Sequence, residues 1–173
     1  MFDALVQSIM TYGAELWGWQ EFEVLERIQT QYFKWCLNLK KEVPNYLILE
    51  EVKRRKIRIN TGKRCLNYEK NIRKNGNKVL ALECVKQIDK RNERNEETKW
   101  DKARREYFER NGYSAPLIKT MFTNETNITK ILTSRDDEVQ KQTLYNKIAK
   151  SVSNENYKKL LTPGLAHYLK QTK

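Results

Sequence analysis

Glycine and proline are scarce in this sequence of 173 residues, which contains only six Gly and three Pro. A sandwich of many short strands needs far more turn-forming residues, so this scarcity argues against that fold class. Disorder is also excluded, because hydrophobic residues make up 39% of the chain. At roughly 100 to 200 residues per domain, the length allows one domain or two small helical lobes, but not a large multidomain enzyme.

Residues that commonly bind metals are few as well. The three cysteines, Cys36, Cys65 and Cys84, have no CxxC spacing, and His167 is the single histidine. A structural zinc site needs four such ligands in a recognisable pattern, so we expect no metal and no cofactor. The sequence also lacks the glycine-rich loops that hold nucleotide phosphates.

Long hydrophobic runs are missing too. No stretch approaches the about 18 apolar residues of a membrane span, and the first residues do not form a secretory leader. We therefore expect an intracellular protein, nuclear or cytoplasmic, without a membrane partner. In that setting the glycosylation-like triplets at Asn124 and Asn127 are interpreted as polar turns.

The apolar residues that are present recur with a helical period of 3.6, and no segment alternates with the period of two of a half-buried strand. The sequence therefore predicts an all-α protein, an irregular array of helices. The clearest patterns predict helices over 21–39 and 56–74. In the first, the apolar face expected to be buried comprises Phe22, Leu25, Ile28, Tyr32, Trp35, Cys36 and Leu39.

Several local signals mark helix ends. Gly112 is typical of a helix stop, and Ser134 followed by Asp137 matches a capping box at a helix start. The stretch 124–129 is the most loop-like of the chain and is a second candidate for a lobe boundary. We divide the sequence into a basic helical region at 1–112 and a smaller helical region at 113–173.

Charge is unevenly distributed. The chain has a net charge of +12, which favours polyanionic partners. Basic residues concentrate in 34–78, as a run of neighbouring cations followed by a stripe of lysines on the next predicted helix. These form the predicted nucleic-acid site: Lys53, Arg54, Arg55, Lys56, Arg58, Lys63, Lys70 and Lys74. A solvated helix face and a nuclear import signal are the alternative interpretations of the run.

Candidate catalytic residues have simpler explanations. Asp136 and Asp137 form the only adjacent aspartate pair, and we expect them in the first turn of a helix, where negative charge is favourable. His167 is interpreted as a surface residue because no nucleophile motif accompanies it. Trp17 and Trp19 could stack on bases or anchor a protein partner, although core packing is favoured for both, and also for Trp35 and Trp100. We expect no enzymatic activity.

Four blocks of sequence resemble a known family. YGAELWGW within residues 1–19, LERIQ within 21–51 and GKRCLNYE at 62–69 occur in the same order as in the segment that follows the polymerase domain of insect non-LTR (LINE-type) retrotransposon reverse transcriptases. SNENYKKLLTPGLAHYL at 153–169 is similar to that family's Tyr-rich segment, but Ala166 stands where the family usually has proline.

This resemblance implies a thumb-like region that holds RNA or DNA as a template–primer duplex. The family's catalytic aspartate motif lies upstream of the matched region, so the chain is expected to be a non-catalytic fragment whose natural partner includes the upstream polymerase domain. Loss of that domain would expose apolar residues of the first helix, namely Phe2, Leu5, Val6, Ile9 and Met10. The alternative function is a helical protein–protein interaction module that binds an acidic partner.

Overall fold

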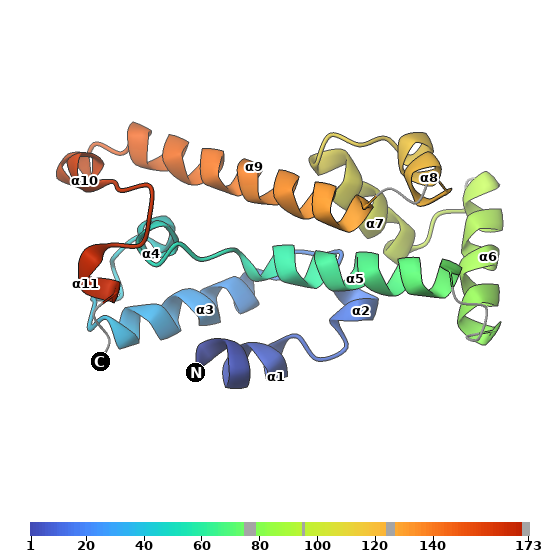
Figure 1. Cartoon of the computed structure of the whole chain (residues 1–173), viewed down its shortest axis with the longest axis horizontal. Helices are drawn as coiled ribbons and strands as arrows, with labels where there is room; N and C mark the ends of the chain where they lie inside the picture. Colours follow the sequence, from blue (N-terminus) through green and yellow to red (C-terminus); the bar gives the residue numbers. More distant parts are fainter. Residues whose placement is uncertain (75–78, 95, 124–126, 171–173) are drawn as a thin grey trace. The chain divides into compact units, whose positions relative to one another are not determined.

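A computed structural model describes residues 1–74, 79–94, 96–123 and 127–170 of the chain. Helices account for 74% of it, and no β-strand occurs among the described residues. The prediction of an all-α, multi-helix array is therefore confirmed (Figure 1). The helices are η1 (Phe2–Gln7, a π-helix), α1 (Ser8–Met10), α2 (Ala14–Trp17), α3 (Glu23–Cys36), α4 (Asn45–Glu51), α5 (Ile57–Lys74), α6 (Val79–Glu93), α7 (Lys99–Arg110), α8 (Ala115–Thr123), α9 (Ile128–Lys150), α10 (Glu155–Leu160) and α11 (His167–Lys170).

The chain divides into two compact units that interleave along the sequence. Unit 1 comprises Met1–Met10, Phe22–Ile57 and Asp136–Lys173, and unit 2 comprises Thr11–Glu21 and Arg58–Arg135. Helix α9 begins in unit 2 and ends in unit 1. The division at residue 112 was predicted from helix-end signals in the sequence, whereas these units are defined by contacts in the structure. The division therefore stays a prediction.

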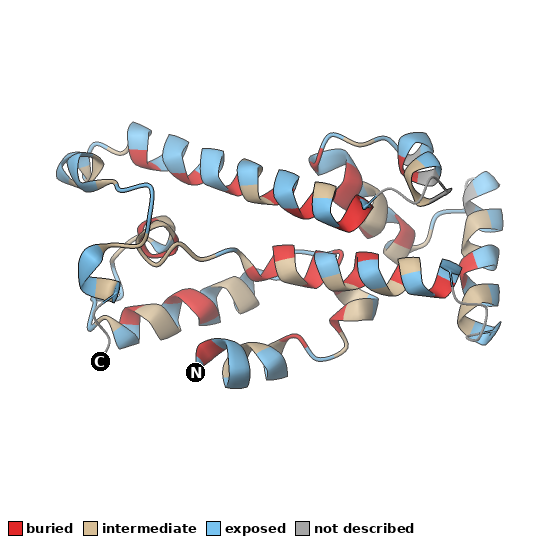
Figure 2. Ribbon diagram, in the orientation of Figure 1, coloured by how far each residue is buried: buried red, intermediate tan, exposed pale blue. Residues whose placement is uncertain are grey.

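Unit 2 has the larger apolar core. It is built by α5, α7, α8, the first turns of α9 and the segment that follows α2, with these buried members: Trp19, Cys65, Leu66, Ala103, Tyr107, Phe108, Ile118, Ile128 and Leu132. The Trp19 ring lies 5.3 Å from that of Tyr107 and 5.6 Å from that of Phe108, between ring centroids. Figure 2 shows the buried residues of α5 recurring along one side of the helix, as its sequence pattern predicts.

Unit 1 combines aromatic packing with polar contacts. Phe2 is buried because its ring packs on the rings of Tyr32 and Phe33, at centroid distances of 4.9 and 5.3 Å. The C-terminal helices α10 and α11 have no buried residues. They contact α4 through the hydroxyls of Tyr157 and Tyr168, which both donate to the Glu51 carboxylate.

Helix ends follow local chemistry, with one wrong prediction. Gly112 ends α7 in the left-handed conformation, with φ of +81°, and this confirms the predicted stop. The predicted start at Ser134 is wrong, since α9 begins at Ile128 and Asn127 accepts a hydrogen bond from the Lys130 N–H at 3.2 Å. Isoleucine and leucine at 128 and 132 extend the buried face upstream of Ser134, so the helix continues through it.

Helix α3 forms where the sequence predicts a helix, but it buries the opposite face. Its buried side chains are Gln29, Thr30 and Lys34. By contrast, Ile28 is 37% exposed and Trp35 is 77% exposed, although both were predicted to lie in the core. For Gln29, the reason lies in the chain segment that its amide binds.

Candidate nucleic-acid interface

The basic run does not form a helix. Residues 52–56 connect α4 to α5 in an irregular conformation, and Lys53 has a φ of +49° just after the end of α4. There the N–H of Arg54 donates to the carbonyl of Leu49 at 2.9 Å, the bond that closes a Schellman motif. The cations of this run therefore do not radiate around a helix axis.

Side chains of two helices bind the backbone of this connector. Gln29 of α3 donates to the carbonyl of Arg55 at 2.9 Å. Gln140 of α9 accepts from the N–H of Lys56 at 2.7 Å and donates to the carbonyl of Arg54 at 2.8 Å. Backbone groups that leave water need such partners, so Gln29 of α3 and Gln140 of α9 face inward. The other two buried side chains of α3 bind elsewhere, since Thr30 donates to carbonyls of its own helix and Lys34 donates to the carbonyl of Lys41.

Two cations of the run, Lys53 and Arg54, contact acidic or carbonyl groups of unit 1. Lys53 bonds to the Glu50 carboxylate and donates to the carbonyl of Thr162 at 2.7 Å. Arg54 pairs with Asp3, and its guanidinium lies 5.5 Å from the ring centroid of Phe2. Each of these contacts reduces the charge that the side chain presents to a polyanion.

Arg55 and Arg58 also have carboxylate neighbours. The Arg55 guanidinium lies 2.6 Å from a carboxylate oxygen of Asp137 on α9, although the Arg55 side chain remains 53% exposed. Arg58 belongs to unit 2, where it is buried with its Nε 3.4 Å from a carboxylate oxygen of Glu21. The backbone of Lys56 is bound by Gln140, and its side chain is half-buried.

The three lysines of α5 are placed differently. Lys63 and Lys74 are exposed and Lys70 is half-buried, and they share one face of the helix with Asn67, whose side chain accepts a hydrogen bond from the Thr129 hydroxyl of α9 at 2.9 Å. No carboxylate pairs with any of these lysines in the part of the chain that the structure describes. At a rise of 1.5 Å per residue they span about 16 Å along the helix. This lysine stripe, Lys63, Lys70 and Lys74, has the geometry predicted from the sequence.

The aspartate pair lies in the middle of α9, rather than in the first turn of a helix as predicted. Asp136 is fully buried, and Asp137 pairs with Arg55. Burial raises the pKa of the Asp137 carboxyl, and the Arg55 and Lys141 cations oppose this shift. His167 is exposed at the start of α11, as expected.

The tryptophans only partly match the sequence analysis. Trp19 is 3% exposed and belongs to the core of unit 2, so it cannot anchor a partner without unfolding. Trp17 is half-buried and donates its ring N–H to the carbonyl of Tyr12 at 3.1 Å. Trp100 packs against the core, as predicted. Trp35, predicted to be buried, is the most exposed tryptophan.

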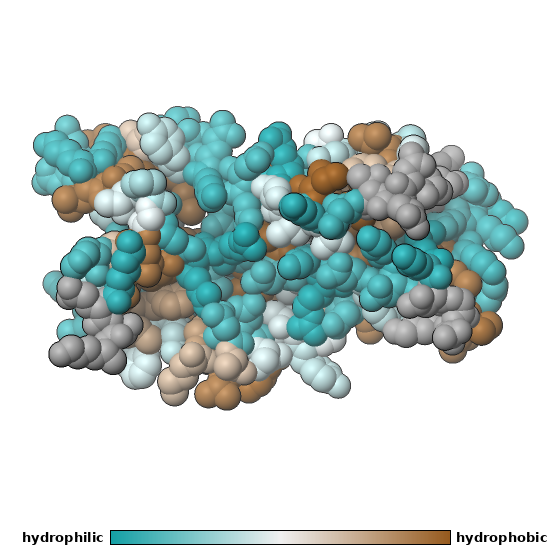
Figure 3. All heavy atoms as spheres, viewed as in Figure 1, coloured by the Kyte–Doolittle hydropathy of each residue, from teal (hydrophilic) through white to brown (hydrophobic). Residues whose placement is uncertain are grey.

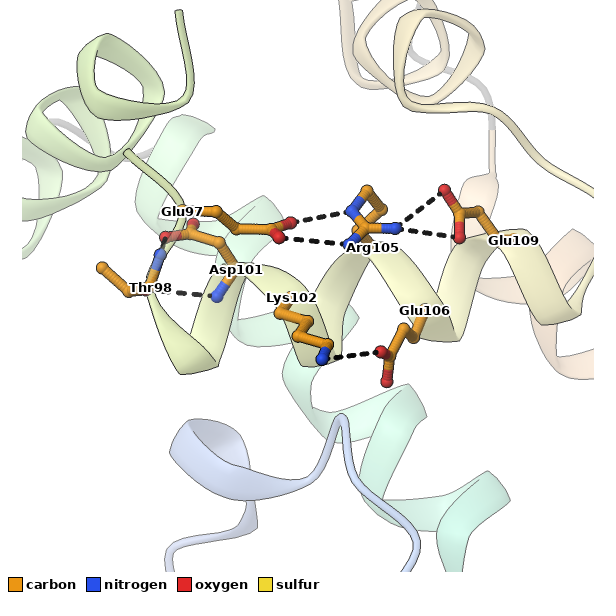
Figure 4. A network of polar contacts seen from close by, with 7 residues as sticks. All are labelled: Glu97, Thr98, Asp101, Lys102, Arg105, Glu106 and Glu109. Atoms are coloured by element: carbon orange, nitrogen blue, oxygen red, sulfur yellow. Dashed lines mark hydrogen bonds and ion pairs between the residues drawn. The ribbon is translucent and has the colours of Figure 1, made fainter. Parts of the chain in front are cut away.

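A polar groove of about 410 Å³ lies along one side of α7 in unit 2. Its lining residues are Trp19, Gln20, Glu21, Lys99, Lys102, Ala103, Glu106, Tyr107 and Arg110. Lys102 lies 3.9 Å from Glu106, whereas Arg105, on a neighbouring face of the helix, is held between Glu97 and Glu109 (Figure 4). The groove thus contains both signs of charge, with three cations and two carboxylates.

No group of three or more His, Cys, Asp or Glu side chains is positioned to hold a metal ion within the described ranges. No helix of the described residues is long and apolar enough to cross a membrane.

The polar contacts of the connector were not predicted from the sequence. Gln29 and Gln140 carry no motif, and they are separated from the backbone groups that they bind by 26 and by 84 to 86 residues. The available signal was weak: Gln140 continues the series Ile128, Leu132 and Asp136 at intervals of four, a spacing that places it on the buried face of α9.

No family model, curated protein or solved structure matches this chain.

Proposed function

We propose that this chain is a non-catalytic, helical nucleic-acid-binding module that binds phosphates through the lysine stripe of α5. The observation that carries the proposal is the exposed face of α5, where Lys63, Lys70 and Lys74 have no carboxylate partner within the described ranges. When such lysines neutralise phosphates, the nucleic acid releases its condensed counterions. This release supplies most of the non-specific affinity for nucleic acid.

The length of the stripe suits a nucleic-acid backbone. A strand of duplex DNA presents one phosphate about every 3.4 Å along the helix axis, so a span of about 16 Å passes several phosphates. Three lysines separated by seven and four residues can therefore each reach a different phosphate. Such contacts position a protein without reading the sequence of bases, and we expect little sequence preference.

The origin of the module is part of the proposal. The blocks YGAELWGW, LERIQ and GKRCLNYE support descent from the region after the polymerase domain of LINE-type reverse transcriptases. A coding sequence for the polymerase aspartate motif, intact or decayed, immediately upstream in the genome would support this origin. Unrelated sequence upstream, at every copy of the locus, would contradict it.

The connector cations are expected to contribute less to nucleic-acid affinity than their number indicates. Lys53, Arg54 and Arg55 would each have to leave a carboxylate or carbonyl before binding a phosphate. If only the lysine stripe binds, the logarithm of affinity for duplex DNA falls with the logarithm of salt concentration with a slope of about −2.7. Full participation of the connector would give a slope steeper than about −4.

The experiment measures duplex affinity by fluorescence anisotropy at several salt concentrations. The test variant carries Lys63→Glu, Lys70→Glu and Lys74→Glu. The matched control carries Lys147→Glu, Lys150→Glu and Lys159→Glu, three exposed lysines elsewhere that change the net charge equally. We expect a flat salt dependence for the first variant and a nearly unchanged slope for the second. Equal losses in both variants would contradict the assignment to α5, and absence of binding by the unaltered chain would contradict the function.

A further inference from the structure

The lysine stripe of α5 has a gap between its first two members. Lys63 and Lys70 are seven residues apart, or about 10.5 Å along the helix axis, whereas Lys70 and Lys74 are about 6 Å apart. A strand of duplex DNA presents one phosphate about every 3.4 Å along its axis, so a backbone that follows the stripe passes a phosphate in this gap. In Figure 3 the surface over α5 is largely hydrophilic in this view.

Asn67 lies in the gap, on the face that carries the lysines. It follows Lys63 by four residues and precedes Lys70 by three, the spacings that place side chains side by side on one helix face, and it is exposed. Its amide is held in one orientation, because its Oδ1 accepts the hydrogen bond from the hydroxyl of Thr129, which is 7% exposed. Helix α9 thus fixes an exposed amide of α5.

This hydrogen bond leaves the other end of the amide as a donor. An asparagine side chain has an acceptor oxygen and an NH₂ group with two donors. The oxygen is used by Thr129, and no acceptor binds the Nδ2 of Asn67 within the described ranges. A phosphate oxygen suits such a donor, because its negative charge strengthens the hydrogen bond. A donor whose orientation is already fixed also loses less conformational freedom when it binds.

We infer that Asn67 donates a hydrogen bond to a backbone phosphate between those bound by Lys63 and Lys70, and that Thr129 is a positioning residue that acts through Asn67. The inference rests on the function proposed for the lysine stripe and adds a contact of a different kind. An uncharged donor neutralises no phosphate, so it contributes to affinity but not to the salt dependence of affinity. This difference separates Asn67 from the lysines in an experiment.

Fluorescence anisotropy of a duplex DNA at several salt concentrations tests the contact. Asn67→Ala should weaken binding about three- to tenfold at every salt concentration, because one hydrogen bond is lost, and should keep the slope of the unaltered chain. The matched control is Asn146→Ala, since Asn146 is exposed near the C-terminal end of α9, and its affinity should be unchanged. Unchanged affinity in Asn67→Ala, or an equal loss in the control, overturns the inference.

A second substitution separates the donor from the rest of the side chain. Asn67→Asp keeps an acceptor for the Thr129 hydroxyl but has no donor, so it should bind the duplex no more tightly than Asn67→Ala. Circular dichroism verifies that each variant is folded. Asn67→Asp that binds as tightly as the unaltered chain would overturn the assignment of the NH₂ group as the contact.

A double-mutant cycle tests the role of Thr129. Thr129→Val removes the hydroxyl and should weaken binding, whereas Thr129→Ser keeps it and should bind like the unaltered chain. In the Asn67→Ala background Thr129→Val should cost no further affinity, because Thr129 acts only through Asn67. Equal losses in both backgrounds would overturn the positioning role.

The outcome for Asn67 is distinguishable from the outcome for the stripe. If charge reversal of the three lysines removes the salt dependence while Asn67→Ala binds normally, this inference is wrong and the proposed function stands. Absence of duplex binding by the unaltered chain would overturn both.

Discussion

The Gln140 amide makes two hydrogen bonds to the connector backbone, of the kind that a neighbouring strand would make. It accepts a hydrogen bond from the N–H of Lys56 and donates one to the carbonyl of Arg54. An amide offers both a donor and an acceptor, so it satisfies two backbone groups of an extended segment at once. Loss of this side chain would remove both hydrogen bonds, and a buried polar group left unpaired costs about 1 to 3 kcal/mol.

Gln140→Ala should therefore lower the free energy of unfolding by about 2 to 4 kcal/mol. Urea denaturation followed by circular dichroism measures the change. Gln142→Ala is the control, because Gln142 is exposed on the same helix and should change stability by less than about 0.5 kcal/mol. Equal effects of the two substitutions would show that the connector does not depend on the Gln140 amide.

The buried thiol of Cys65 is expected to make the protein less stable at alkaline pH. Burial raises the pKa of its thiol to about 12, from an ordinary value of 9.0. The unfolded chain therefore loses this proton first, and stability should fall as pH rises above about 9, by about 1 kcal/mol at pH 10. Burial and a hydrogen bond to Glu51 likewise raise the pKa of Tyr168 to about 12, which adds to the loss above pH 10.

Urea unfolding at pH 8, 9 and 10 measures this dependence. The variant Cys65→Ala should lose stability at pH 8, through the missing packing, but should show a smaller further loss between pH 8 and pH 10. An identical pH dependence in the variant and the unaltered chain would exclude the Cys65 thiol as its source.

At the level of helices, α5 and α7 touch at a glycine. A Cβ atom added to Gly62 would lie 2.7 Å from the nearest ring carbon of Tyr107, which is 1% exposed. Replacing glycine by alanine inside a helix normally stabilises it by about 1 kcal/mol. Here the steric overlap is expected to outweigh this gain, because overpacking in a core costs about 1 to 3 kcal/mol of stability.

Gly62→Ala should thus destabilise the protein, by about 1 to 2 kcal/mol net, as measured by thermal or urea unfolding. Gly164→Ala provides the comparison, since a Cβ there meets no atom within 4 Å. Stabilisation by Gly62→Ala would mean that α5 and α7 are not in close contact.

The 3.6-residue period of the apolar residues predicted that both α3 and α5 are helices. It predicted the buried face of α5 but not that of α3. On α5 the 3.6-residue period predicts a buried stripe of Ile57, Thr61, Cys65, Tyr68 and Ile72. All of them are buried except Tyr68, which is half-buried. On α3, Gln29 is buried in place of Ile28, because its amide binds the carbonyl of Arg55. The lysine stripe could likewise be predicted, since it depends on spacing within one helix. The pairing of Arg54 with Asp3, 51 residues away, could not.

At the scale of the whole molecule, neither compact unit is a continuous piece of chain. Unit 1 is assembled from three segments and unit 2 from two. The core of unit 2 unites Trp19 and Tyr107 with Ile118 and Leu132, which lie on opposite sides of residue 112. Separation at this residue would divide the core, with apolar surface left exposed on both pieces.

The separate fragments 1–112 and 113–173 should consequently be poorly folded. We expect their summed circular dichroism to show less helix than the intact chain, with recovery when they are mixed. Two fragments that each unfold cooperatively on their own would instead support residue 112 as a domain boundary.

The connector also has a consequence for the timing of folding during synthesis. Gln140 follows Arg54 by 86 residues, and a ribosome adds about 5 to 20 residues per second. For about 4 to 17 seconds, therefore, the carbonyl of Arg54 and the N–H of Lys56 have been made while the amide that binds them has not. During this interval the connector lacks the side chain that bridges these two backbone groups, a state in which a nascent chain is open to capture by chaperones.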